Sequence, residues 1–243
     1  MQQEKTADSI SGKILRRDEL FALRRRENPN LTQNTFSWQL AEEIRLGTLQ
    51  HLGRNTYRVN DMNTAYPMKK YNYPSSREIE ELTKLIREAY PFAEFQIWES
   101  AQYNEFLNHL LAKNIIFVES EKMLIESIYE TLRKAEKYHV LVAPTLNEMK
   151  RYVDNNTIIL TKLTTQSPKN KDDSTQPPLE KLLTDLYANR YLKCSISIDE
   201  YSQVFNRALT TYQISFPRLK RYAQRRNVYD KILPYLFPEA GEI

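Results

Sequence analysis

Apolar residues recur at helical spacing in a short segment near the start of the chain. The pattern predicts a helix over residues 15–26, with Leu20, Phe21 and Leu23 forming its apolar stripe. Residues 28–30 read Asn-Pro-Asn and end this helix, because the residue before a proline disfavours helix and asparagine suits turns.

A second helix is predicted over residues 32–46. Thr32 can cap its start, and Phe36, Leu40 and Ile44 share one face. Gly47 stops it. Strand-like segments follow at 48–51 and 56–59, around a turn in which Gly53 or Asn55 can take a positive φ. The order helix, sharp turn, helix, hairpin is that of a winged helix-turn-helix, and we assign it to residues 1–60.

The remainder of the chain alternates between strands and helices. Residues 60–75 have no periodicity and mark a domain boundary, and Ser75 opens a capping box for a helix that Pro91 closes. Strands are predicted at 93–98, 114–119, 139–143 and 157–163, and helices at 101–112, 121–137 and 146–153. This alternation predicts a mixed, largely parallel α/β domain over residues 70–243.

The last third of the chain is predicted to be helical. Residues 164–176 are polar and are expected to form a mobile loop. The helices of the C-terminal tail are expected at 178–190, 198–212, 216–226 and 228–235. In the first of them Lys181 and Asp185 have the i, i+4 spacing of a surface ion pair.

Composition excludes several classes of protein. Hydrophobic residues are 41% and charged residues 27% of the 243 residues, as in globular proteins. No apolar run is long enough for a membrane span or a signal peptide, so a cytoplasmic location is expected. One cysteine, three histidines and four glycines give no support to a zinc site, a histidine-based metal centre or a phosphate-cradling loop. We therefore expect no metal and no cofactor.

Basic residues concentrate near the two ends of the chain. Residues 1–60 contain ten Lys and Arg against seven Asp and Glu, whereas the other 183 residues contain 25 against 24. In the second helix and the hairpin we expect seven residues to contact double-stranded DNA: Gln33, Asn34, Ser37, Gln39, Arg45, Arg54 and Arg58. Trp38 is expected to pack in the core rather than to stack on a base.

A second basic cluster lies in the predicted helix 216–226. Its members are Arg218, Lys220, Arg221, Arg225 and Arg226, and the alternative to a solvated basic face is contact with a protein partner or a nucleic acid. The buried face of this helix is expected to consist of Phe216, Leu219, Tyr222 and Ala223.

Strand-end carboxylates raise an enzymatic alternative. Glu99 and Glu119 could hold Mg²⁺ in a nuclease or a transferase. The nuclease spacing is wrong, because Glu119 lies three residues before Lys122 rather than two, and we assign no catalytic residues. A module that only binds proteins is the third possibility, since a fold does not determine a function.

Short motifs also resemble a family, the AbiEi-type antitoxins of type IV toxin–antitoxin systems. The motifs are Leu15-Arg16-Arg17-Asp18-Glu19-Leu20, Phe36-Ser37-Trp38-Gln39-Leu40, Gly53-Arg54-Asn55-Thr56-Tyr57, Ile97-Trp98-Glu99, Pro178-Leu179-Glu180-Lys181 and Arg221-Tyr222-Ala223-Gln224-Arg225-Arg226. The resemblance spans about residues 14–232 and is closest to a bacterial branch described only as a domain of unknown function. It implies a phage-defence autorepressor that binds its own promoter and counteracts a nucleotidyltransferase toxin. Asn55 departs from the glycine usual in the wing turn of that family.

Overall fold

A computed structural model describes residues 13–60 and 68–236 of the chain. It is a mixed α/β structure with two separate sheets, one of three strands and one of four. The predicted start of the first domain, residues 1–12, and most of the predicted boundary region, residues 61–67, lie outside the described residues, as do residues 237–243.

The first sheet belongs to residues 13–60. Strand β1 (Ile14–Arg16) leads into helix α2 (Arg17–Glu27), helix α3 (Gln33–Leu46) and the hairpin of β2 (Leu49–Gly53) and β3 (Thr56–Val59). Strand β3 is central and pairs antiparallel with both neighbours. The prediction that a helix begins at Leu15 was wrong by two residues, because Ile14 to Arg16 instead supply the second partner of β3.

Caps at both ends fix α3, as predicted. The Thr32 hydroxyl accepts a hydrogen bond from the backbone N–H of Thr35, and Gly47 ends the helix in the left-handed conformation with φ 78°. Leu31, Phe36 and Leu40 are buried with residues of α2 and the hairpin in a core of their own.

The second sheet has the order β4-β5-β7-β6. Its strands are β4 (Phe95–Glu99), β5 (Ile115–Ser120), β6 (Val140–Val142) and β7 (Thr157–Lys162). The β5–β7 and β6–β7 pairs are parallel, but β4 runs antiparallel to β5. The sheet is therefore mixed.

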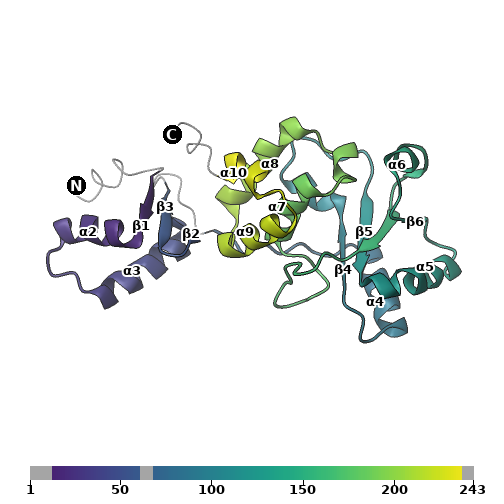
Figure 1. Cartoon of the computed structure of the whole chain (residues 1–243), viewed down its shortest axis with the longest axis horizontal. Coiled ribbons are helices and arrows are strands. Elements are labelled where there is room, and N and C mark those ends of the chain that lie inside the picture. Colours follow the sequence, from purple (N-terminus) through teal and green to yellow (C-terminus); the bar gives the residue numbers. More distant parts are fainter. Residues whose placement is uncertain (1–12, 61–67, 237–243) are drawn as a thin grey trace.

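Helices cover both faces of this sheet (Figure 1). Helices α4 (Arg77–Ala89) and α5 (Ile125–Lys134) pack on one face, over a core that includes Leu82, Ile116 and Leu132. Helices α6 (Leu146–Tyr152), α7 (Leu179–Ala188), α8 (Tyr201–Thr211), α9 (Phe216–Arg225) and α10 (Tyr229–Leu236) contribute to the core on the other face. The C-terminal helical tail is thus one layer of a three-layer structure.

Of the helices predicted after β4 and β5, the first is wrong and the second is too long. Residues 101–112 form only a 3₁₀ helix, η1 (Ser100–Glu105), followed by irregular chain. Side chains from α8 bind the carbonyls there: Gln203 donates to Phe106 O at 3.0 Å and Arg207 to Leu107 O at 2.8 Å. The helix predicted at 121–137 is a 3₁₀ turn, η2 (Lys122–Leu124), followed by the shorter α5.

One smaller prediction also needs correction. Ser76, not Ser75, caps α4 by accepting from Ile79 N, so the predicted capping box does not form. Residues 164–176 are irregular, as their composition predicts, but Thr175 O accepts from Ile97 N at 2.8 Å and Pro168 O accepts from the Gln96 side chain at 2.7 Å. These two contacts attach the segment to β4, and its mobility stays a prediction.

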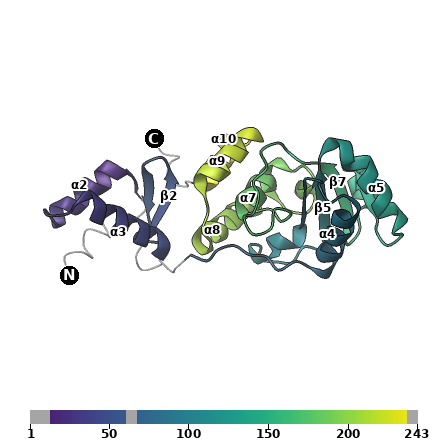
Figure 2. The ribbon, with the colours of Figure 1, turned by 90° about the horizontal axis from the view of Figure 1, so that it is seen from below.

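The hairpin of the small sheet packs between helix α3 and the helices of the larger part of the molecule. Strand β2 contacts α3 on one side and α9 on the other, and the views in Figures 1 and 2 both show β2 beside α9 and α10. Helices α2 and α3 lie at the far end, away from the large sheet (Figure 1).

Candidate nucleic-acid interface

The first half of α3 presents polar side chains to solvent. Gln33, Asn34 and Ser37 are all exposed, as predicted, because the apolar residues of the helix face α2 and the hairpin. The Ser37 hydroxyl donates to Gln33 O at 2.7 Å and accepts from Arg17 Nη2 at 2.8 Å. Ser37 therefore holds Arg17 beside the start of α3, and Asn34 is the more available side chain for a ligand.

Gln39 does not share the face of Asn34. Five residues along an α-helix turn the side chain by about 140° beyond a full revolution. Gln39 is half-buried and lines a pocket with Arg24 and Glu43. The prediction placed Gln39 and Asn34 on one reading surface, and the helix geometry separates them.

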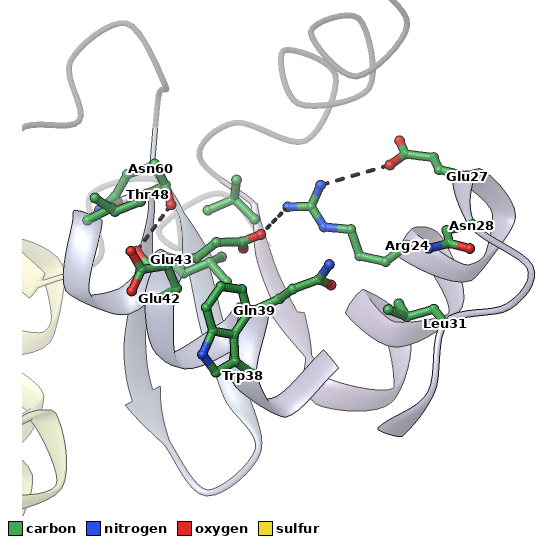
Figure 3. Close-up of a pocket in the computed structure, with 13 residues that line it drawn as sticks. Arg24, Glu27, Asn28, Leu31, Trp38, Gln39, Glu42, Glu43, Thr48 and Asn60 are labelled. Carbon is green, nitrogen blue, oxygen red and sulfur yellow. Dashed lines mark hydrogen bonds and ion pairs between the residues drawn. The ribbon is translucent and has the colours of Figure 1, made fainter. Parts of the chain in front are cut away.

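The prediction that Trp38 packs in the core is wrong. Its side chain is 68% exposed, because it lies near the middle of the outward face of α3, opposite Phe36 and Leu40. Trp38 forms one wall of a pocket of about 400 Å³ between α2, α3 and the start of β2 (Figure 3).

Acidic side chains dominate this pocket. Arg24 bridges Glu43 at 3.0 Å and Glu27 at 3.9 Å, and Glu42 lies on the same side of α3 (Figure 3). Burial raises the pKa of the Glu43 carboxyl above its usual value, and Arg24 offsets part of this. With three carboxylates and one guanidinium, this flank of α3 opposes a polyanion.

The end of α3 and the hairpin carry the three predicted phosphate-binding arginines. Arg45 is exposed and bonded to Glu42 at 2.8 and 2.5 Å. Arg54 is exposed in the hairpin turn, where Asn55 takes the positive φ, 58°. Arg58 is half-buried, with its Nη1 3.4 Å from Leu236 O of α10. Of the three arginines, Arg54 is the most accessible to a phosphate, because it is exposed and no ion pair within the described residues has to break first.

Helix α9 buries the face predicted for it, Phe216, Leu219, Tyr222 and Ala223. Its basic cluster divides into two groups. Arg218 lies 3.6 Å from Glu180, Arg226 lies 3.0 Å from Asp185, and Arg225 donates to the Thr165 hydroxyl. Lys220 and Arg221 instead face the turn of the hairpin, across a groove that Arg54 also lines.

A buried cluster of charges lies behind α9. Lys181 is 0% exposed, and its Nζ lies 2.8 Å from Glu119 and 2.5 Å from Asp185. Burial alone would lower the pKa of Lys181, but Asp185 and Glu119 together raise it well above its usual value. The predicted surface ion pair of Lys181 and Asp185 is thus a core interaction. Helix α7 buries eight of its ten residues, because α9 packs against it and its apolar residues join the core on this face of the sheet.

The carboxylates of the enzymatic alternative do not form one site. Antiparallel pairing places Glu119 opposite Gln96 and Glu99 opposite Ile116, so the two lie about 10 Å apart along the strands. They also lie on opposite faces of the sheet, since Phe117 and Val118 alternate between the two cores. Glu119 accepts from Trp98 Nε1 at 2.9 Å and from Lys181, and Glu99 accepts from Asn114 at 2.6 Å. In each carboxylate one oxygen is thus bonded within the fold, whereas the other, Glu99 Oε1 or Glu119 Oε2, is buried without a hydrogen-bond partner among the described residues.

Residues 35–238 match a protein family of unknown function, DUF6577. The chain belongs to this family. The match covers most of α3, the hairpin, the large sheet and all of α9. No curated protein matches the chain.

In residues 13–60 and 68–236, no three His, Cys, Asp or Glu side chains gather as they would to hold a metal ion. Over the same ranges, no helix combines the length and the apolar character needed to cross a bilayer.

Proposed function

We propose that this protein is a transcription regulator that binds double-stranded DNA through a winged helix-turn-helix at its N-terminus. The order β1, α2, α3, β2, β3 around one small core supports this assignment. The single observation that carries the proposal is that α3, the second helix of the pair, exposes a polar face beside a hairpin with Arg54 at its turn.

Five exposed side chains have a role in the proposed DNA binding. Asn34 and Gln33 reach base edges in the major groove, where an asparagine can bind adenine with two hydrogen bonds. Arg54 contacts the phosphate backbone, and Arg45 does so after exchanging Glu42 for a phosphate. Ser37 acts indirectly, because its hydroxyl holds the Arg17 side chain where it can contact a DNA phosphate.

The resemblance to AbiEi-type antitoxins supports a biological setting for this binding. In that setting the DNA is the promoter of the protein's own gene, and residues 70–243 counteract a nucleotidyltransferase toxin. Co-expression of the full chain with the product of a neighbouring toxin-like gene tests the second role. If the chain does not restore growth to cells that express the toxin, the antitoxin role is refuted.

Equilibrium titration of labelled duplexes tests the DNA-binding role. The wild type should prefer the region upstream of its gene over a random duplex. Asn34→Ala should reduce this preference by about 1–3 kcal/mol, since a bidentate base contact is lost. Asn206→Ala, at an exposed position of α8, is the matched control and should change nothing. No binding to either duplex at low salt would refute the function.

One observation favours a second candidate, a protein-binding module. Trp38 is exposed next to the carboxylates of Glu42 and Glu43, and tryptophan is enriched at the centres of protein interfaces. A basic partner would fit this flank. A partner whose binding is abolished by Trp38→Ala, with no DNA binding by the wild type, would favour this candidate.

A further inference from the structure

A groove of about 680 Å³ lies between the turn of the β2–β3 hairpin and helix α9. Its apolar floor includes Ile14, Leu52 and Tyr229, and its polar rim includes Arg54, Lys220 and Arg221. The two sides are far apart in the sequence and meet only because β2 packs beside α9 (Figure 2).

The rim is uniformly positive. None of the residues that line the groove is acidic, and none of the three basic residues forms an ion pair within the part of the chain that the structure describes. The pocket beside Trp38 has the opposite character, with three carboxylates and one arginine. The groove at the hairpin is therefore open to an anion, whereas the α2 side of α3 repels one.

The fold holds these cations in place before any ligand arrives. The buried face of α9, with Leu219, Tyr222 and Ala223, turns Lys220 and Arg221 outward. The Lys220 ammonium lies 5.3 Å from the centroid of the Tyr229 ring, a cation–π distance. Arg54 lies in a tight turn beside Asn55, whose left-handed φ closes the hairpin. Less side-chain entropy is lost on binding when the charges are already positioned.

We propose that this groove binds the phosphate backbone of the duplex held by α3, so that the DNA-binding surface continues past the hairpin onto α9. The inference rests on the proposed DNA-binding function and extends it to a second part of the chain. Helices α3 and α9 both contact strand β2, and packed elements lie about 10 Å apart, whereas one turn of DNA is about 34 Å long. A duplex that touches α3 and the hairpin therefore reaches α9 within the same turn.

The basic residues of the groove should act together on the salt dependence of binding. Each phosphate contact contributes about 0.9 to the slope of log affinity against log salt, so a fourfold rise in salt costs about threefold in affinity per contact. Lys220→Gln combined with Arg221→Gln should remove about two contacts. The double variant should then lose about tenfold less affinity than the wild type over that salt range.

Fluorescence anisotropy with a labelled random-sequence duplex and the full chain provides the measurement. Lys134→Gln, an exposed charge loss on α5 across the sheet, is the matched control and should keep the wild-type slope. Thermal unfolding checks that all variants are folded.

Two results would overturn the inference while leaving the proposed function intact. One is an unchanged slope for the double variant when the wild type binds the duplex. The other is displacement of the duplex by AMP at equal phosphate concentration, which would make the groove a mononucleotide site. A wild type that binds no duplex at low salt would instead refute the proposed function itself.

Discussion

Replacing Lys181 by methionine should destabilise the protein strongly without leaving a large cavity. Methionine has nearly the length of lysine and is tolerated in cores. The change removes the ammonium group that joins Glu119 to Asp185, at 2.8 and 2.5 Å. Both carboxylates remain buried, and Arg226 compensates only Asp185.

The magnitude follows from the charge left unpaired. Lys181, Glu119, Asp185 and Arg226 together are neutral, and the variant leaves a net charge of −1 in the core. Removing one partner of a buried ion pair costs about 3–5 kcal/mol. Since small domains are stable by about 5–15 kcal/mol, the loss is a large fraction of the total.

Urea unfolding followed by circular dichroism gives the free energy of unfolding. Combining Lys181→Met with Glu119→Gln makes the buried cluster neutral again. The amide oxygen of the new glutamine can still accept the hydrogen bond from Trp98. The double variant should therefore recover about 2 kcal/mol or more of the single variant's loss. A single variant within about 1 kcal/mol of the wild type, or a double variant at the sum of the two single losses, would refute a structural role for this buried charge network.

Three further predictions concern single positions. Trp38→Ala should change the free energy of unfolding by only about 0.5 kcal/mol, because the side chain is exposed, and a loss of about 3 kcal/mol in urea titration would mean that it is packed. Burial and the nearby Asp185 raise the pKa of Tyr222 to about 12, so its contribution to stability is complete below the unfolded pKa of about 10 and is lost between about pH 10 and pH 12. Spectrophotometric titration of tyrosinate, with Tyr222→Phe as the comparison, checks this, and an identical titration curve for the two proteins would contradict it. Asn55→Ala should cost about 1 kcal/mol, since alanine is strained at a φ of 58°, whereas Asn55→Gly should be near neutral in thermal unfolding.

The sequence predicted correctly the helix whose two ends are set by capping residues next to it in the chain. Thr32 and Gly47 delimit α3 because a hydroxyl cap and a left-handed glycine act within a few residues. The helix predicted at 101–112 failed because Gln203 and Arg207, about a hundred residues away, bind the carbonyls that a helix would have used. Strand β1 is too short for periodicity, and only its pairing with β3 defines it.

The candidate site shows the same division between local and distant causes. Exposure of Asn34 follows from the apolar stripe of α3, which is visible in the sequence. The antiparallel direction of β4 is not visible there, and it places Glu99 and Glu119 at opposite ends of the paired strands. The pairing register, equally invisible, places them on opposite faces. The burial of Lys181 likewise depends on α9 covering α7. Helix α7 has few polar residues, which was a signal that it is buried. The i, i+4 spacing of Lys181 and Asp185 instead suggested that one side of the helix faces solvent.

The buried charges and the basic groove belong to one line of contacts through the molecule. Glu119 of the central strand β5 holds Lys181, Lys181 holds Asp185, and Asp185 accepts from Tyr222 at 3.2 Å. Tyr222 and Ala223 are the residues of α9 that turn its opposite side outward. The orientation of Lys220 and Arg221 toward the hairpin is therefore set from the interior of the sheet, because a helix whose buried face is fixed by hydrogen bonds cannot rotate about its axis. Under the proposed function, the packing of the larger part of the molecule would therefore be coupled to the strength with which α9 and the hairpin bind a phosphate backbone.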